Sequence, residues 1–290
     1  MHTPAGHVPD HGTSDAPGRV WVAGTWAHYS SDDVEDSLRP EAVSPLFRGR
    51  FGHPYIYRPS CPSTQELVRG LAEGAVASCE QQTAGRGRLG RQWVSPWGAG
   101  VLFSLALEPR TPAERLPPFG LVVAEAVCEA CWPEAQVRWP NDVVVHGQKL
   151  AGVLAELREG RLVVGVGVNA NHAAAELPPA ARVQATSLRI LRGAPVDRAQ
   201  LLADLVASIE ARYTRFEQDG FTGLERDELR GRRVELAGGA SGESTGVDEH
   251  GRLVVAGRAH TSAEVTAVLV GEDGGDYTSL DTEAECHDGS

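Results

Sequence analysis

Lysine is almost absent from this sequence: Lys149 is its one lysine, against 26 arginines. Asparagine is also scarce, with Asn141, Asn169 and Asn171 as the only three. Arginine can replace lysine on a solvated surface, whereas a site that needs a compact point charge does not accept a planar guanidinium. A lysine that persists against such a bias indicates a functional position, and Lys149 is therefore a candidate catalytic residue.

Long apolar runs and paired cysteines are missing as well. No stretch reaches the roughly 18 apolar residues that cross a membrane, and the polar start of the chain lacks the apolar core of a signal peptide. Five scattered cysteines are too few for a disulfide scaffold. Cys128 and Cys131 form a C-x-x-C pair without the second ligand pair that zinc needs, so we expect free, buried thiols. These absences favour a cytoplasmic protein.

The surplus of negative charge is concentrated at the two ends of the chain. Of a formal net charge of −12, the first 50 residues hold seven acidic and four basic side chains, and the last 20 hold seven acidic ones and no basic one. The segment between them is nearly neutral and lacks the broad basic face that binds nucleic acid. We therefore expect no nucleic-acid partner, although a local basic loop can still bind one small anion.

The composition divides the chain into four parts. Residues 1–34 are rich in glycine, proline and histidine, and residues 271–290 are acidic and rich in glycine; both are predicted to be disordered. Residues 35–227 have the patterned segments of a folded domain. In residues 228–270 short apolar runs alternate with glycine-containing turns, which is typical of a small antiparallel β domain.

Within the larger domain, the pattern predicts a mixed α and β structure. Long helices are expected at 119–132 and 197–220, where apolar residues recur at helical spacing. A shorter helix is expected to begin at Ser63, with Glu66 completing a capping box, and to end at Gly74. Strands are expected at 75–82, 101–108, 136–139, 142–146, 149–157 and 161–169.

A glycine-rich loop, TAGRGRLGRQW, carries three arginines and no acidic residue. Gly85, Gly87 and Gly90 match the dinucleotide-binding pattern G-x-G-x-x-G, but that pattern opens a helix, whereas this loop leads through proline and glycine into a strand. The loop better suits one small anion, because arginine donates bidentate hydrogen bonds to carboxylate or phosphate and glycine lets the backbone close over a ligand. The candidate side chains are Arg86, Arg88, Arg91 and Trp93, whose indole can stack on a purine.

A second polar cluster lies in RWPNDVVVHGQKLAG, with GVGVN some residues later. Asn141 stands at a turn and Asn169 at a strand end. A carboxamide can pair with the mixed donor and acceptor edge of a base, but asparagine is also a common turn former, and the sequence leaves both interpretations open. Lys149 begins the next strand, where it would supply a fixed positive charge.

Together these motifs resemble those of the biotin protein ligase family. EQQTAGRGRLGRQW resembles its glycine–arginine ligand loop, and RWPND followed by QKLAGVLAE resembles its adenylate-binding segment. PSTQE and GVGVN match the entry to its first helix and a later strand, and the four motifs stand in the family's order. The resemblance implies an α+β fold, in which a mixed sheet with helices on one side, as in class II tRNA synthetases, precedes a small SH3-like β-barrel.

The implied function is that of an ATP-dependent biotin–protein ligase. Such an enzyme uses ATP and Mg²⁺ to convert biotin to biotinyl-5′-AMP, and then transfers biotin to a lysine in the biotin carboxyl carrier domain of a carboxylase. No membrane partner is implied, and a homodimer is left open. Some members also carry an N-terminal helix-turn-helix and repress transcription, but the glycine- and proline-broken start of this chain is not expected to form one.

The resemblance also assigns roles to individual residues. Lys149 and Arg88 are the expected catalytic residues, and Asp142 is the nearest candidate ligand for Mg²⁺. The residues expected to bind biotin are Ser63, Thr64, Gln65, Gln82, Arg86, Gly87, Arg88, Lys149 and Gly152, although the family usually has asparagine where this chain has Gln65. The residues expected to bind ATP or the adenylate are Arg86, Arg88, Arg91, Trp93, Asn141 and Asn169.

Two alternatives fit parts of the pattern. One is a lipoate–protein ligase of the same superfamily, and the other is a non-catalytic module that binds biotin or nucleotide. The GRGR loop and the terminal β domain favour biotin over lipoate. A binding module would be stabilised by its ligand without releasing pyrophosphate.

Overall fold

The computed structural model describes residues 19–22, 25–28, 37–158, 160–179, 183–261, 263 and 265–269. Strands β1 (Arg19–Val22) and β2 (Thr25–His28) pair as an antiparallel hairpin inside the segment 1–34, for which we predicted disorder. At these eight positions the structure therefore differs from that prediction, because the two short runs satisfy each other's backbone groups. The rest of 1–34 and the acidic segment 271–290 lie outside the described residues, as does Cys286.

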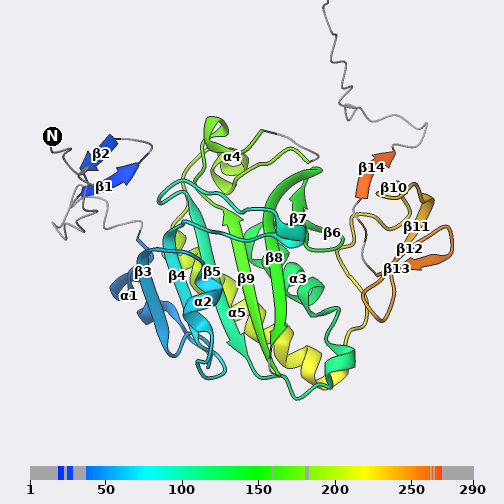
Figure 1. Cartoon of the computed structure of the whole chain (residues 1–290), viewed down its shortest axis with the longest axis horizontal. Coiled ribbons are helices and arrows are strands. Elements are labelled where there is room, and N and C mark those ends of the chain that lie inside the picture. Colours follow the sequence, from blue (N-terminus) through cyan, green and yellow to red (C-terminus); the bar gives the residue numbers. More distant parts are fainter. Residues whose placement is uncertain are drawn as a thin grey trace, which may run out of the picture.

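A seven-stranded sheet of order β3-β4-β5-β9-β8-β7-β6 forms the centre of the larger domain (Figure 1). Neighbouring strands pair antiparallel, except that β3 and β4 run parallel. The long central pairs hold the sheet rigid where the site lies. The strands are β3 (Tyr55–Cys61), β4 (Val76–Gln82), β5 (Gly100–Leu107), β6 (Gln136–Arg138), β7 (Asp142–Val145), β8 (Gln148–Arg158) and β9 (Arg161–Asn169).

The two long helices cover one face of this sheet. Helices α3 (Phe119–Cys131) and α5 (Arg198–Asp219) pack on each other and on the central strands, close to where the sequence predicts them. Their apolar faces form the main core, to which α1 (Pro40–Val43) adds. The remaining helical segments are α2 (Thr64–Val68), α4 (Leu188–Arg192), η2 (Ser44–Leu46), η3 (Arg88–Gly90), η4 (Ala113–Arg115) and η5 (Ala174–Glu176).

The opposite face of the sheet is covered only in part, by α2. In β9 the side chains of Val164 and Val168 point into the main core, whereas Val163 packs with Val68 of α2 on the other side. Because successive side chains of a strand alternate between faces, the next two residues on the face of Val163 are Gly165 and Gly167. This leaves an uncovered stretch of sheet beside α2, where the candidate site lies.

Helix α2 is shorter than the sequence predicts. Ser63 is its N-cap residue, but its side chain makes no capping hydrogen bond, so the predicted capping box is wrong. The helix ends at Val68, because Arg69 is extended and Gly70 takes a positive φ of 78° that turns the chain four residues before Gly74. The short helix instead presents its first residues to the open face of the sheet.

A second, five-stranded antiparallel sheet follows, of order β13-β12-β11-β10-β14. It lies beside the β6 edge of the large sheet (Figure 1). The α+β class, with a large mixed sheet and a second small β unit, is thus as predicted; the boundary at residues 227 and 228 stays a prediction. The strands are β10 (Arg233–Leu236), β11 (Ser241–Val247), β12 (Leu253–Val255), β13 (Arg258–His260) and β14 (Val265–Leu269).

The cysteines of the described segments are free and buried. Cys128 and Cys131 lie inside α3, as predicted, and burial raises the pKa of both thiols, which keeps them protonated. None of the helices that the structure describes has the length and apolar character needed to cross a membrane.

Candidate active site

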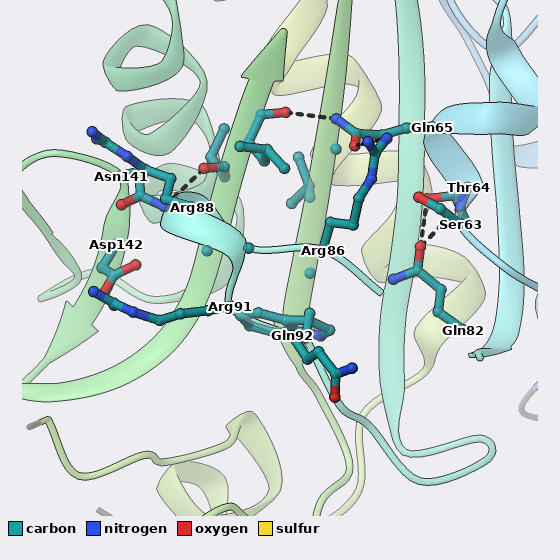
Figure 2. A pocket seen from close by; sticks show the side chains of 18 of the residues that line it. Ser63, Thr64, Gln65, Gln82, Arg86, Arg88, Arg91, Gln92, Asn141 and Asp142 are labelled. Atoms are coloured by element: carbon teal, nitrogen blue, oxygen red, sulfur yellow. Dashed lines mark hydrogen bonds between the residues drawn. The ribbon is translucent and has the colours of Figure 1, made fainter. Parts of the chain in front are cut away.

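A pocket opens on the uncovered face of the large sheet (Figure 2). It is bounded by the start of α2, the end of β4, the glycine–arginine loop and strands β7, β8 and β9. Of the site residues predicted from the sequence, the following line it: Ser63, Thr64, Gln65, Gln82, Arg86, Gly87, Arg88, Arg91, Trp93, Asn141, Asp142, Lys149 and Gly152. The structure therefore brings motifs that are far apart in the sequence to one place.

The floor of the pocket is made of glycine. Gly152 of β8 pairs with Gly167 of β9, and Gly165 lies two residues before Gly167 on the same face. A Cβ atom at Gly167 would stand 2.5 Å from the Trp93 indole, and one at Gly152 would stand 3.0 Å from it. Trp93 thus packs directly on the backbone of two strands, which only glycine permits.

Several pocket residues were not predicted from the sequence. The glycines of GVGVN carried a detectable signal, because glycines at i and i+2 of a strand leave one face bare. The other residues have ordinary identities for a strand or loop, so the sequence gives no sign of them. The additional lining residues are Gln92, Phe103, Val153, Leu154, Gly165, Val166 and Gly167.

The glycine–arginine loop folds into a small hairpin over this floor. The Gly87 amide donates to the Arg91 carbonyl at 2.7 Å, and the Trp93 amide donates to the Gly85 carbonyl at 3.0 Å. At the tip, Leu89 has a positive φ of 56° and is 68% exposed. The tip therefore faces solvent, while Arg86 and Arg88 line the pocket (Figure 2).

The end of the pocket at α2 and β4 is rich in neutral hydrogen-bonding groups, with the Arg86 guanidinium beside them. The Gln82 Oε1 atom accepts from the Thr64 amide at 2.9 Å and from the Thr64 hydroxyl at 3.3 Å. Thr64 Oγ1 also lies 2.8 Å from Ser104 Oγ. These bonds fix which way round the Gln82 carboxamide lies, so α2 and β4 present a set of oriented neutral groups.

The other end is cationic. Lys149 Nζ lies 2.7 Å from Asp142 Oδ1 and 5.5 Å from the centre of the Trp93 ring. Burial lowers the pKa of the Arg88 guanidinium, and the Asp142 carboxylate opposes that shift; an arginine remains protonated at neutral pH in either case. Arg88, Arg91 and Lys149 thus outweigh one carboxylate, and this end suits an anionic group.

The backbone of Lys149 is held by the segment around Ala185. Its amide donates to the Gln184 carbonyl at 2.7 Å, and its carbonyl accepts from the Thr186 amide at 2.9 Å. A parallel bridge to Ala185 continues this contact. The backbone of the one lysine of the chain is therefore fixed, and its flexible side chain extends from that fixed position.

The two predicted asparagines occupy different environments. Asn141 lines the pocket, where its Nδ2 donates to the Val153 carbonyl at 2.9 Å. Asn169 does not line it: the side chain is 5% exposed, and its Nδ2 donates to the carbonyls of Thr186 at 3.0 Å and Lys149 at 3.4 Å. The segment around Thr186 covers the Asn169 carboxamide and accepts its hydrogen bond, so Asn169 lies outside the pocket lining, and its contact with the adenylate stays a prediction.

Asp142 is the single carboxylate among the described residues that line the pocket. No group of three His, Cys, Asp or Glu side chains in the described segments could hold a metal ion by itself. Magnesium, however, is often bound by one or two carboxylates together with substrate phosphates. Asp142 fits such a site, in which a nucleotide supplies the remaining oxygen ligands.

Two donors in the pocket wall have no acceptor within the described part of the chain. They are the Trp93 Nε1 and Arg86 Nε atoms, and both are buried. A buried donor without a partner costs free energy, so these groups indicate a site that a ligand with acceptor atoms completes.

Residues 59–171 match the biotin/lipoate A/B protein ligase family. The chain is 32% identical over 250 residues to the bifunctional ligase/repressor BirA of Bacillus subtilis. This alignment covers 78% of this chain and 74% of that protein. It is 35% identical over 199 residues to the biotin--[acetyl-CoA-carboxylase] ligase of Mycobacterium tuberculosis. This second alignment covers 62% of this chain and 73% of that protein. Its fold is similar to that of the biotin protein ligase from Aquifex aeolicus in complex with biotin and ATP, with a TM-score of 0.61 and 30% identity across 73% of this chain and 94% of that one.

Proposed function

Because this chain belongs to the biotin/lipoate A/B protein ligase family, we propose that it is an ATP-dependent biotin–protein ligase. The polarity of the pocket carries the proposal. Oriented neutral groups of Thr64 and Gln82 lie at one end, and the cations Arg88 and Lys149 lie at the other, across a bare glycine floor. Biotin has the same arrangement, with a neutral ureido ring that donates and accepts hydrogen bonds, and a carboxylate at the end of its chain.

The first reaction forms a mixed anhydride. A carboxylate oxygen of biotin attacks the α-phosphorus of ATP, the bond to the β-phosphate oxygen breaks, and pyrophosphate leaves. Negative charge gathers where carboxylate and phosphate meet, and Lys149 and Arg88 stand at that end of the pocket. Fixed cations there stabilise the transition state more than the separated substrates.

The second reaction transfers biotin to a carrier domain of a carboxylase. The neutral ε-amine of the acceptor lysine attacks the acyl carbon, an amide bond forms, AMP leaves with the bonding electrons, and the amine nitrogen releases one proton to solvent. Arg88 and Lys149 would stabilise the departing phosphate. We assign Trp93, Arg91 and Asn141, which line the same end, to the nucleotide.

Magnesium would be held by Asp142 together with phosphate oxygens, and it would neutralise charge on the triphosphate. Asp142 pairs with Lys149 at 2.7 Å, so the same carboxylate also orients the catalytic cation. Both assignments follow from its place as the one carboxylate among the described lining residues.

The relatives named above favour biotin over lipoate as the substrate of this chain. The cytoplasmic location, a homodimer and the absence of a nucleic-acid partner stay predictions.

The direct test is isotope exchange between pyrophosphate and ATP on the purified chain, with biotin and lipoate as parallel substrates and Mg²⁺ present. We expect exchange with biotin alone, followed by transfer to an apo carrier domain. Exchange with lipoate alone would show that the chain is a lipoate–protein ligase of the same fold rather than a biotin–protein ligase. Ligand-induced stabilisation without exchange would leave the non-catalytic module as the correct description.

A further inference from the structure

Gln65 lines the pocket, but its carboxamide is bonded at both ends to the protein. Its Nε2 donates to the Leu154 carbonyl at 3.0 Å, and its Oε1 accepts from Arg86 Nη2 at 3.0 Å. The residue is 4% exposed. These bonds fix the orientation of the carboxamide between Leu154 and Arg86 and leave it one N–H and one lone pair, whereas the sequence predicted a contact with biotin alone.

Arg86 is held on one side and open on another. Its Nη2 atom lies 3.5 Å from Glu156 Oε2 and 3.0 Å from Gln65 Oε1, whereas its Nε is buried without an acceptor in the described part of the chain. Figure 2 shows the side chain crossing the pocket from the loop toward Gln65. Gln65 and Glu156 thus tie the loop across the pocket, while the Arg86 Nε donor has no acceptor in the described part of the chain.

The support under Gln65 is rigid. Its side chain rests on the bare backbone of Gly165 in β9, where a Cβ atom would stand 3.1 Å from Gln65 Cγ. Leu154, which accepts its amide, pairs with Gly165 in the neighbouring strand β8. Two paired strands therefore fix the position from which Gln65 reaches the loop.

We propose that Gln65 is a positioning residue: it holds Arg86, and with it the glycine–arginine loop, across the pocket. This inference deepens the proposed function and rests on it. A loop that is already ordered loses less conformational entropy when the substrate binds, so the affinity for biotin rises while the chemical step is unchanged. Asparagine is one methylene shorter and does not span from Leu154 to Arg86.

The test uses the full chain with Gln65→Met, which keeps the length of the side chain and removes both polar ends. The matched control is Gln200→Met on the exposed surface of α5, where Gln200 bonds only locally to Asp204. In the absence of ligands, trypsin should cut the loop arginines about tenfold faster in Gln65→Met, as expected for the loss of a hydrogen bond to a charged group. The control should be cut like the parent chain.

Kinetics provide the second readout. In pyrophosphate exchange, Gln65→Met should raise the KM for biotin about tenfold and leave kcat within about twofold, because a positioning residue acts on binding rather than on the reacting atoms. The double variant Gln65→Met/Arg86→Ala should be no weaker than Arg86→Ala alone, since both changes remove one interaction.

Unchanged trypsin cleavage together with additive effects in the double variant would overturn the proposal. A fall in kcat at unchanged KM would also overturn it, because it would place Gln65 in the chemistry. If Gln65→Met does not fold, Gln65→Asn gives the same cleavage comparison with a shorter amide. If even the parent chain lacks exchange with biotin, the proposed function fails, while the cleavage comparison still decides whether Gln65 holds the loop.

Discussion

At the scale of single residues, the Lys149 ammonium makes two contacts that a planar guanidinium could not reproduce together. Its ammonium lies 2.7 Å from Asp142 and over the Trp93 ring, and its backbone is fixed by the segment around Ala185. A compact charge can serve the carboxylate, the ring and a substrate anion at once, whereas a planar fork is directional. This gives a physical reason for one lysine among 26 arginines.

Replacing Lys149 by alanine should lower the rate of biotin-dependent pyrophosphate exchange by on the order of 10²–10³. Lys149→Arg should also be strongly impaired, because the longer fork does not fit between Asp142 and Trp93. Circular dichroism should show an unchanged fold for both variants. Full activity of Lys149→Ala would remove this residue from the mechanism.

The two asparagines show where inference from residue identity ends. Asn141 and Asn169 are two of the three asparagines in the chain, and each stands beside an apolar strand in a motif. One lines the pocket, and the other supports the backbone of Lys149 from outside it. The difference depends on the segment around Thr186, which is 17 residues from Asn169 in sequence and accepts its hydrogen bond.

At the scale of elements, the paired strands β8 and β9 make room for the site because they have glycine, without a side chain, at the pocket floor. Gly152, Gly165 and Gly167 leave a strip of bare backbone on which Trp93 and Gln65 rest. Burying an aromatic ring directly on strand backbone gains apolar contact and fixes the ring plane. The floor therefore fixes the positions of both Trp93 and Gln65.

Substituting Gly167 by alanine should displace Trp93, since the new Cβ would stand 2.5 Å from its indole. We expect the KM for ATP to rise by roughly tenfold or more, because ring stacking is worth on the order of 1–3 kcal/mol. The control is Gly120→Ala in α3, where the nearest atom lies 3.8 Å away; it should leave the KM for ATP unchanged. An unaltered KM in Gly167→Ala would show that Trp93 does not bind the nucleotide.

At the scale of the whole molecule, the small β sheet is tied to the edge of the active-site domain next to the pocket. Trp139 Nε1 donates to the Gly251 carbonyl at 2.9 Å, and Arg138 pairs with Glu228. Trp139 is 2% exposed and lies two residues before Asn141. The two units therefore meet at the segment that leads into the cationic end of the pocket.

Stability of the whole fold should depend on His172, which is 1% exposed and lies 3.0 Å from Ser95 Oγ. Burial lowers its pKa to about 4, against a smaller opposing effect of Glu176. The folded pKa is thus below the unfolded value of about 6.5. Between these two values the unfolded chain binds more protons, so the free energy of unfolding falls as the pH falls.

The loss between pH 6.5 and 4 should be on the order of 3 kcal/mol for this one group. Urea unfolding of the parent chain and of His172→Gln across this range measures it. The variant should lose less stability on acidification, and its curve above pH 6.5 should run parallel to that of the parent. Identical pH dependence in the two chains would mean that His172 does not account for the acid sensitivity.

The α+β class, the long helices, the central strands and most of the residues around the pocket could be predicted from the sequence. Helical and strand periodicity and short motifs are local properties, so they can be read along the chain. The tertiary structure alone decided that Gln65 reaches Leu154, 89 positions away, and Arg86. It also decided that Asn169 is covered and that α2 ends at Val68. Hydrogen bonds between distant segments depend on how strands are paired, and no local pattern encodes that pairing.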